Sequence, residues 1–208
     1  MNHLVVIGDL IQSRRSTNRQ LLQTQLKTVL AQINAQVPLL SPYTLTLGDE
    51  FQAVLTSADG VFHQLTTILQ AIHPIKARFA LGVGEITTPI NPTQALAMDG
   101  PAFYGAREGI DQLKKNGELF ALINQQSPLP TQALINPTLD LLSHQIKKWK
   151  ANRLEIFNRL NSGQDIKTIA KSLAISDKAV YKNISEGAIE TVMDSMTAIE
   201  QQMNTQLS

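Results

Sequence analysis

The sequence predicts an α+β fold that ends in a small all-α module. Three observations lead to this prediction. An apolar, β-branched run stands near the amino terminus, strand and helix patterns then alternate as far as residue 123, and beyond about residue 150 only helical periodicity remains. The 208 residues suffice for one medium domain and one small one. We expect a first domain at 1–126, a connecting segment at 127–150 and a helical domain at 151–208.

Each element of the first domain has its own signal. Apolar residues at helical spacing predict three helices: 18–37, 61–72 and 99–116. Alternating or continuous apolar runs predict five strands: 4–7, 44–47, 51–55, 76–84 and 118–123. The order strand, helix, hairpin, helix, strand predicts a ferredoxin-like βαββαβ core, to which a further helix and strand are appended.

An acidic turn joins the two strands of the hairpin. The pair Gly48-Asp49 stands between two apolar arms and is favourable turn chemistry. A carboxylate held at a rigid turn is a suitable oxygen ligand for a hard divalent cation. The same turn also forms when the aspartate only accepts hydrogen bonds from its own backbone, so both interpretations stay open on this stretch alone.

Further polar residues follow the first strand, which we expect to end at Gly8-Asp9. In a ferredoxin-like core this strand and the hairpin are neighbours, so Asp9 is expected near Asp49. Glu50 either joins them as a ligand or points away. Arg14 stands before the first helix, where phosphate binds readily; an exposed basic side chain is the alternative.

The segment 165–184 has the pattern of a helix-turn-helix. Its first helix has an apolar face, Ile175 fills the turn, and Ser176 is expected to cap the second helix. The residues that we expect to face the DNA major groove or its phosphates are Ser176, Lys178, Ala179, Tyr181 and Lys182. A helical module for protein contacts is the alternative.

The distribution of charge has the sign that DNA binding requires. The whole chain has 18 basic and 17 acidic residues, but from residue 145 onward there are nine basic and seven acidic ones. A last amphipathic helix, 186–202, either completes the small domain or pairs with a second copy. Because helix-turn-helix proteins commonly bind paired half-sites, we expect a homodimer.

Composition indicates a soluble protein of the cytoplasm. The chain has no cysteine, which excludes disulfides and zinc thiolate sites and is typical of a reducing compartment. The first residues lack the pattern of a signal peptide, and no apolar run approaches the ~18 residues of a membrane span. We therefore expect no membrane partner.

Three blocks of the first domain carry a resemblance. Residues 6–11 resemble the first metal-binding strand of class III nucleotide cyclases, 46–51 the second, and 100–110 the helix that carries a transition-state arginine, here Arg107. With the helix-turn-helix after them, the sequence resembles the SatD family over nearly its full length.

The resemblance implies a nucleotide-cyclase-type palm domain with a phosphate site. Asp9 and Asp49 would hold Mg²⁺ or Mn²⁺ with a nucleotide ligand, Ser13, Arg14 and Arg107 would contact phosphate, and Arg107 is also the candidate catalytic residue. Two positions depart from the cyclase pattern: Leu45 and Phe103 stand where cyclases usually carry lysine and asparagine. Base recognition and ribose positioning are therefore not implied.

Three functions follow from these motifs. The first is a DNA-binding regulator whose cyclase-like domain binds a metal–nucleotide or related phosphate ligand. The second is a metal-dependent nucleotide cyclase or phosphodiester enzyme that the helix-turn-helix targets to DNA. The third is a scaffold that uses both parts for protein contacts.

Overall fold

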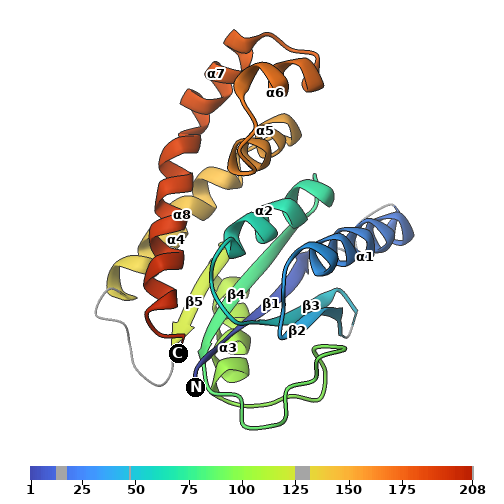
Figure 1. Cartoon of the computed structure of the whole chain (residues 1–208), viewed down its shortest axis with the longest axis vertical. Coiled ribbons are helices and arrows are strands. Elements are labelled where there is room, and N and C mark those ends of the chain that lie inside the picture. The colour runs from blue at the N-terminus through green and yellow to red at the C-terminus, as the bar shows by residue number, and fades with distance from the viewer. Residues whose placement is uncertain (13–17, 47, 125–131, 208) are drawn as a thin grey trace.

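The computed structural model describes residues 1–12, 18–46, 48–124 and 132–207, and within them the chain has a mixed α+β fold (Figure 1). The five strands are β1 (His3–Ile11), β2 (Ser41–Leu45), β3 (Glu50–Leu55), β4 (Lys76–Gly84) and β5 (Phe120–Asn124). The first three helices are α1 (Arg19–Gln36), α2 (Val61–Ala71) and α3 (Pro101–Asn116). Five more follow: α4 (Gln132–Ile146), α5 (Ala151–Asn161), α6 (Ile166–Leu173), α7 (Asp177–Gly187) and α8 (Ile189–Asn204).

All five strands form one mixed sheet in the order β2-β3-β1-β4-β5. β1 is antiparallel to both of its neighbours, β3 and β4, and only the pair β4–β5 is parallel. The hairpin predicted around Gly48 is present, and Gly48 has the positive φ of 73° that such a turn favours. The sheet therefore places the hairpin beside the first strand, as expected.

The first strand is longer than predicted. It continues through Gly8 and Asp9 to Ile11 and pairs with β4 along its whole length. Gly8 is not a strand end, because the ring of Phe51 occupies the space where a Cβ atom would stand. A glycine in the strand lets a buried aromatic ring of the neighbouring strand approach its backbone closely.

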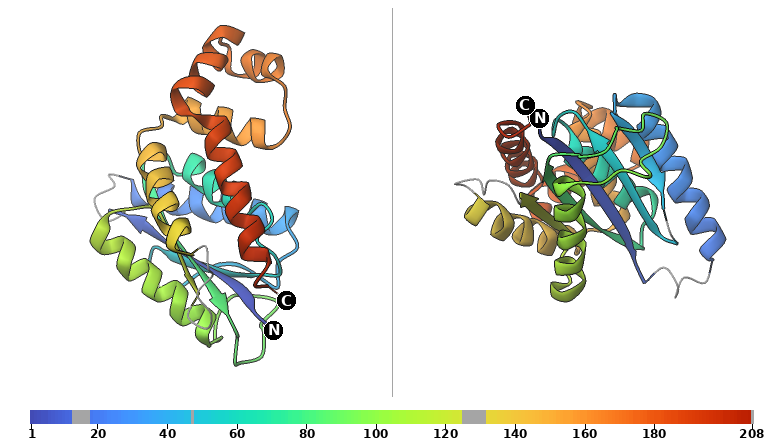
Figure 2. Two further views of the ribbon diagram at one scale, coloured as in Figure 1. Left: turned by 90° about the vertical axis from the view of Figure 1, so that its left-hand side faces the viewer. Right: turned by 90° about the horizontal axis from the view of Figure 1, so that it is seen from below.

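Helices cover both faces of the sheet. α1 and α2 lie over one face, where alternate β1 residues such as Leu4 and Val6 join a large apolar core. α3 lies over the other face (Figure 2) and packs on Val5 and Ile7. This layering follows from the two-residue period of a strand, which sends successive side chains to opposite faces.

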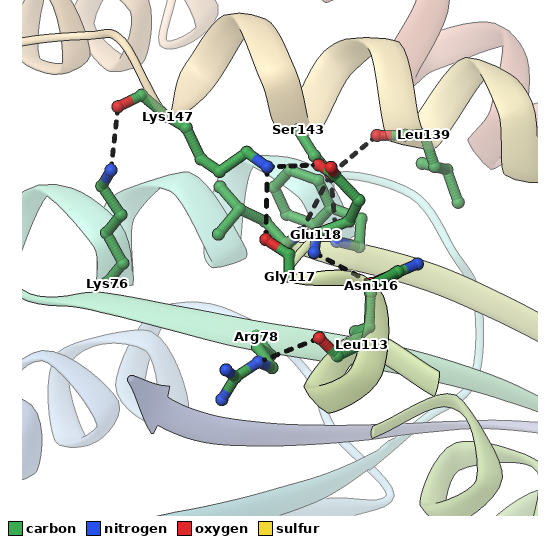
Figure 3. Close-up of polar contacts among 11 residues, drawn as sticks. Lys76, Arg78, Leu113, Asn116, Gly117, Glu118, Leu139, Ser143 and Lys147 are labelled. Atoms are coloured by element: carbon green, nitrogen blue, oxygen red, sulfur yellow. Dashed lines mark hydrogen bonds and ion pairs between the residues drawn. The ribbon is translucent and has the colours of Figure 1, made fainter. Parts of the chain in front are cut away.

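α4 closes the exposed edge of the sheet. Asn136 pairs with the backbone of Leu122 in β5 as a strand would, through a 2.9 Å bond that accepts its N–H and a 3.0 Å bond that donates to its carbonyl. Two turns further along α4, the hydroxyl of Ser143 accepts hydrogen bonds from the backbone N–H groups of Leu119 and Phe120 (Figure 3). An unpaired strand edge invites pairing with another chain, so these side chains protect it.

We expect Asn136→Ala to destabilise the fold by about 1–3 kcal/mol, because two backbone groups of β5 lose their partners. Chemical denaturation monitored by circular dichroism measures this change. Thr138→Ala, also in α4, removes a hydroxyl that donates to the carbonyl of Leu134 within the same helix; it is the matched control and should cost less than half as much. Equal effects of the two substitutions would contradict the edge-capping role of Asn136.

The carboxyl-terminal helices pack on the sheet layer through α2. Asn158 of α5 accepts a 2.7 Å bond from the Thr66 hydroxyl and donates a 2.6 Å bond to Gln70. Glu200 of α8 accepts from the backbone N–H groups of Gly60 and Phe62, at the start of α2. Burial raises the pKa of the Glu200 carboxyl, although these two bonds oppose the change. One apolar core runs from the sheet into α8, and independent folding of 1–126 and 151–208 stays a prediction.

The apolar stripe of α8 is buried within the chain. Ile189, Val192, Met196, Ile199 and Met203 are all at most 5% exposed, against α2, α4 and α7. The stripe therefore packs not only within the predicted helical domain, on α7, but also on α2 and α4 outside it, and the homodimer stays a prediction. Within the residues described, no helix is long and apolar enough to cross a membrane.

Candidate functional site

Three charged residues form a row across the centre of the sheet. Asp9 of β1 stands opposite Glu50 of β3 on one side and opposite Arg78 of β4 on the other. Residues directly opposite in an antiparallel pair project to the same face, with Cβ atoms about 5 Å apart. The alternation along β1 puts this row on the face that α3 covers, since Val5 and Ile7 of the same strand pack there.

Arg78 organises the row. Its Nη1 lies 3.1 Å from Oδ2 of Asp9, and its Nε donates a 3.2 Å bond to the carbonyl of Leu113 near the end of α3. Both side chains of the ion pair are less than one fifth exposed. Figure 3 shows Arg78 reaching toward Leu113 beside β1. The guanidinium thus fixes the Asp9 carboxylate at the carboxyl end of α3.

Asp49 lies next to this row but has a different partner. Its backbone carbonyl accepts a 3.3 Å bond from the N–H of Leu10, which keeps the turn against β1. Its carboxylate lies 3.5 Å from Nη2 of Arg19, the first residue of α1 on the opposite face of the sheet. The turn is therefore close to Asp9, while the two carboxylates are held by separate arginines. A metal ion shared by both stays a prediction.

Arg107 belongs to a third group, in the first half of α3. It lies 3.6 Å from Asp99, which also accepts a 2.7 Å bond from the Tyr104 hydroxyl and so raises the pKa of that phenol. Its guanidinium lies 5.9 Å from the ring of Phe103, which is fully buried. Leu113, where Arg78 meets α3, is six residues or about 9 Å of helix away. The structure does not bring Arg107 into the row of Asp9.

Two predicted phosphate contacts, Ser13 and Arg14, lie outside the described residues. The segment that holds them joins the end of β1 to Asn18, whose side chain caps α1 by accepting from the N–H of Leu21. Nothing further is placed for this part of the predicted site.

The carboxylates near Asp9 could supply a small number of oxygen ligands to a divalent cation. Mg²⁺ and Mn²⁺ are commonly held by one or two carboxylates, with phosphate oxygens and water completing the shell. Asp9 and Glu50 supply two carboxylates on one face. Among the residues described, no three of His, Cys, Asp and Glu gather to hold an ion. An ion at Asp9 would also have to share or displace Arg78; once bound, it would neutralise phosphate charge.

The second predicted site lies at the end of the molecule away from the sheet, where α6 and α7 stand beyond α5 (Figures 1 and 2). The two helices are joined by a tight turn in which Ala174 has a positive φ of 52° and the N–H of Ile175 bonds to the carbonyl of Ala170. Ile169, Ala170 and Val180 are buried between them. Ser176 caps α7 by accepting from the N–H of Ala179, as predicted.

The remaining predicted contact residues lie on the outside of α7. Lys178, Tyr181 and Lys182 are exposed, Tyr181 by 58%, and Ala179 is partly covered. Lys182 lies 3.8 Å from Glu186, one turn further along. A large aromatic side chain that stays in solvent between two lysines is suited to a partner surface rather than to the core.

Sequence reasoning missed Arg78 and left Glu50 open. Arg78 stands in the run 76–84, for which the sequence pattern predicts a central strand and no site residue. The signal that identifies it is register: once β1 pairs with β4, the position opposite Asp9 must hold a compensating charge. Register between distant strands is not readable from one sequence.

A family model matches this chain. The match is to the SatD family and spans residues 3–202. The chain belongs to the SatD family. A search of curated proteins found no relative of this sequence.

Proposed function

We propose that this member of the SatD family is a DNA-binding regulator whose sheet domain binds a phosphate ligand, with or without a divalent cation. The observation that carries the proposal is the helix pair α6–α7. It combines a short turn, a capped second helix and an exposed face with two lysines and a tyrosine. These features support a helix-turn-helix whose second helix enters the major groove.

The sheet supports the second half of the proposal. The order β2-β3-β1-β4, antiparallel throughout, is the order of a ferredoxin-like core, and this supports a palm-type domain. Its central strand carries Asp9, beside a turn that carries Asp49. Phosphate binding is favoured over cyclisation because Phe103, at the position of a ribose-contacting residue in cyclases, is buried in the core.

The packing offers a route by which one part can influence the other. α2 covers the sheet, and its start and middle bind Glu200 of α8 and Asn158 of α5. α5 in turn packs on α7. The Asp49 turn is connected to this route through Arg19 of α1, which packs on α2. A ligand at Asp49 that shifts α1 and α2 against the sheet would change the support of α7, which is the physical requirement for coupling between sites.

Ligand-induced thermal stabilisation tests the phosphate site. The full chain is heated with Mg²⁺ or Mn²⁺ and each nucleoside triphosphate, and product formation is followed in the same samples. We expect at least one triphosphate to raise Tm of the wild type, since a ligand that binds only the folded state stabilises it. The increment should be lost in Asp9→Asn and reduced in Asp49→Asn.

Asp111→Asn, an exposed aspartate on α3, is the matched control and should keep the wild-type increment. The increment is compared with each variant's own ligand-free Tm, because Asp9→Asn also removes the partner of Arg78. If no triphosphate shifts Tm at millimolar concentration, or if Asp9→Asn keeps the full increment, the phosphate site is wrong. Turnover that disappears in Asp49→Asn would favour the enzyme instead of the regulator.

A further inference from the structure

A basic groove of about 560 Å³ lies where the end of α4, the start of α5 and the second half of α7 meet, with His73, just beyond α2, also in its lining. Three cationic side chains line it, those of Lys148, Lys150 and Arg153, against the single carboxylate of Glu186. The groove is thus positive, although the whole chain has a net charge of only +1. None of the site residues discussed for the sheet contributes to it.

A buried tryptophan directs two of these cations outward. Trp149 is only 4% exposed and packs on Phe157, with ring centroids 5.3 Å apart. Its backbone N–H bonds to the carbonyl of Ile146, which fixes the turn between α4 and α5. Because Trp149 points into the core, Lys148 and Lys150 on either side are exposed and face the groove. The packing of Trp149 fixes the backbone positions of the two lysines, while their long exposed side chains stay free to adapt.

Hydrogen bonds from α4 and α5 hold α7 in place as the opposite wall of the groove. Arg153 lies 3.3 Å from Oδ1 of Asn183 and 3.1 Å from Oε2 of Glu186, both of α7. Gln145 of α4 donates a 3.1 Å bond to the carbonyl of Gly187 at the end of the same helix. These three contacts fix the spacing between the lysine-bearing turn and α7. The width of the groove is therefore set by contacts between helices and not by the positions of its exposed side chains.

The groove is continuous with the exposed face of α7. Glu186, on its wall, also lies 3.8 Å from Lys182, which belongs to the face that the proposed function assigns to DNA. α5 begins at the groove with no side chain capping it, so its first N–H groups add to the positive field there. A ligand that lies along α7 and carries repeated negative charges would meet both surfaces at once.

We propose that this groove holds the phosphate backbone of the DNA that flanks the bases contacted by α7, with Lys148 and Lys150 each neutralising one phosphate. The inference rests on the proposed function. Backbone contacts of this kind set the register and orientation of a protein on the duplex and carry no sequence information themselves. Lys148 and Lys150 are then orienting contacts for the helix that reads the sequence.

The test is the salt dependence of duplex binding by the full chain. Fluorescence anisotropy is measured with a duplex selected by the wild type and with a scrambled duplex, each over a series of salt concentrations. The slope of log K against log salt is negative, and each lost phosphate contact reduces its magnitude by about 0.9, so K148A/K150A should reduce the magnitude by about 1.8. At ~0.15 M salt the same relation predicts about a 30-fold loss of affinity, equal for both duplexes.

K114A/K115A is the matched control, since it removes two exposed lysines of α3 and the same charge. It should keep the slope within about 0.3, because screening limits the effect of distant charges. A slope in K148A/K150A that equals the control would overturn the inference and leave the proposed function standing. A loss of affinity confined to the selected duplex would also overturn the inference. So would a result in which K148A/K150A loses thermal stabilisation by tripolyphosphate but binds both duplexes as the wild type does. Absence of duplex binding by the wild type would remove the proposed function and the inference together.

Discussion

Gly82→Ala is expected to destabilise the fold by about 3–5 kcal/mol. Gly82 lies in β4 directly beneath α3, and a Cβ atom there would meet the carbonyl oxygen of Ala102 and lie 2.6 Å from the backbone nitrogen of Ala106. Both are helix backbone atoms that hold hydrogen bonds, so neither can turn aside as a side chain would. The helix as a whole would have to lift from the sheet.

Denaturant unfolding of the purified variant measures this cost. Gly84→Ala is the control on the same strand and face, where the added atom would lie 3.0 Å from Ala102 N and 3.2 Å from Pro101 Cβ. At that distance a small shift relieves the contact, and we expect a cost of about 1 kcal/mol. Equal costs at the two glycines, or a Gly82→Ala variant within about 1 kcal/mol of the wild type, would show that α3 does not pack as closely as described.

Replacing Lys178, Tyr181 and Lys182 together by alanine should lower affinity for a selected duplex by about 10²-fold or more. The two lysines account for about 30-fold at ~0.15 M salt if each neutralises one phosphate. Loss of base or sugar contacts by Tyr181 adds about 1–3 kcal/mol. All three side chains lie on the exposed face of α7, so the free energy of unfolding should change by less than about 0.5 kcal/mol.

The matched control removes the same charge from a different surface of the protein. K114A/K115A with Tyr104→Ala removes two lysines and an exposed tyrosine from α3. This control should bind the selected duplex within about threefold of the wild type, because screened charges on a distant face contribute little. If both triple variants lose the same affinity, overall charge and not the surface of α7 explains the binding.

The arrangement of strands and helices was predictable because its signals are local. The apolar runs, the Gly48 turn and the helical stripes each occupy a short stretch, and the structure confirms an α+β fold with a five-stranded sheet. The predicted end of β1 was wrong because the residue that decides it is distant in the sequence. Gly8 reads as a strand terminator, but the ring of Phe51, more than 40 residues away in the chain, is what the missing Cβ accommodates.

The candidate site was predictable only in part, for a similar reason. The placement of the Asp49 turn beside β1 follows from the order of elements. The ion pairs do not, since Arg78 with Asp9 and Arg19 with Asp49 depend on register and on which face each side chain takes. The cap by Ser176 was readable because N-cap chemistry is set within four residues. The groove at Lys148 was not, because helices α4, α5 and α7 form it together.

Selection from a pool of random duplexes tests the central claim, that α7 binds DNA and recognises its sequence. The full chain is used, with and without Mg²⁺ and nucleotide, and the triple α7 variant is carried through the same rounds. We predict enrichment of one motif by the wild type, as a pseudo-palindrome with half-sites about 10 base pairs apart if two copies bind, and none by the variant. No enrichment by the wild type, or the same motif from the variant, would contradict the account.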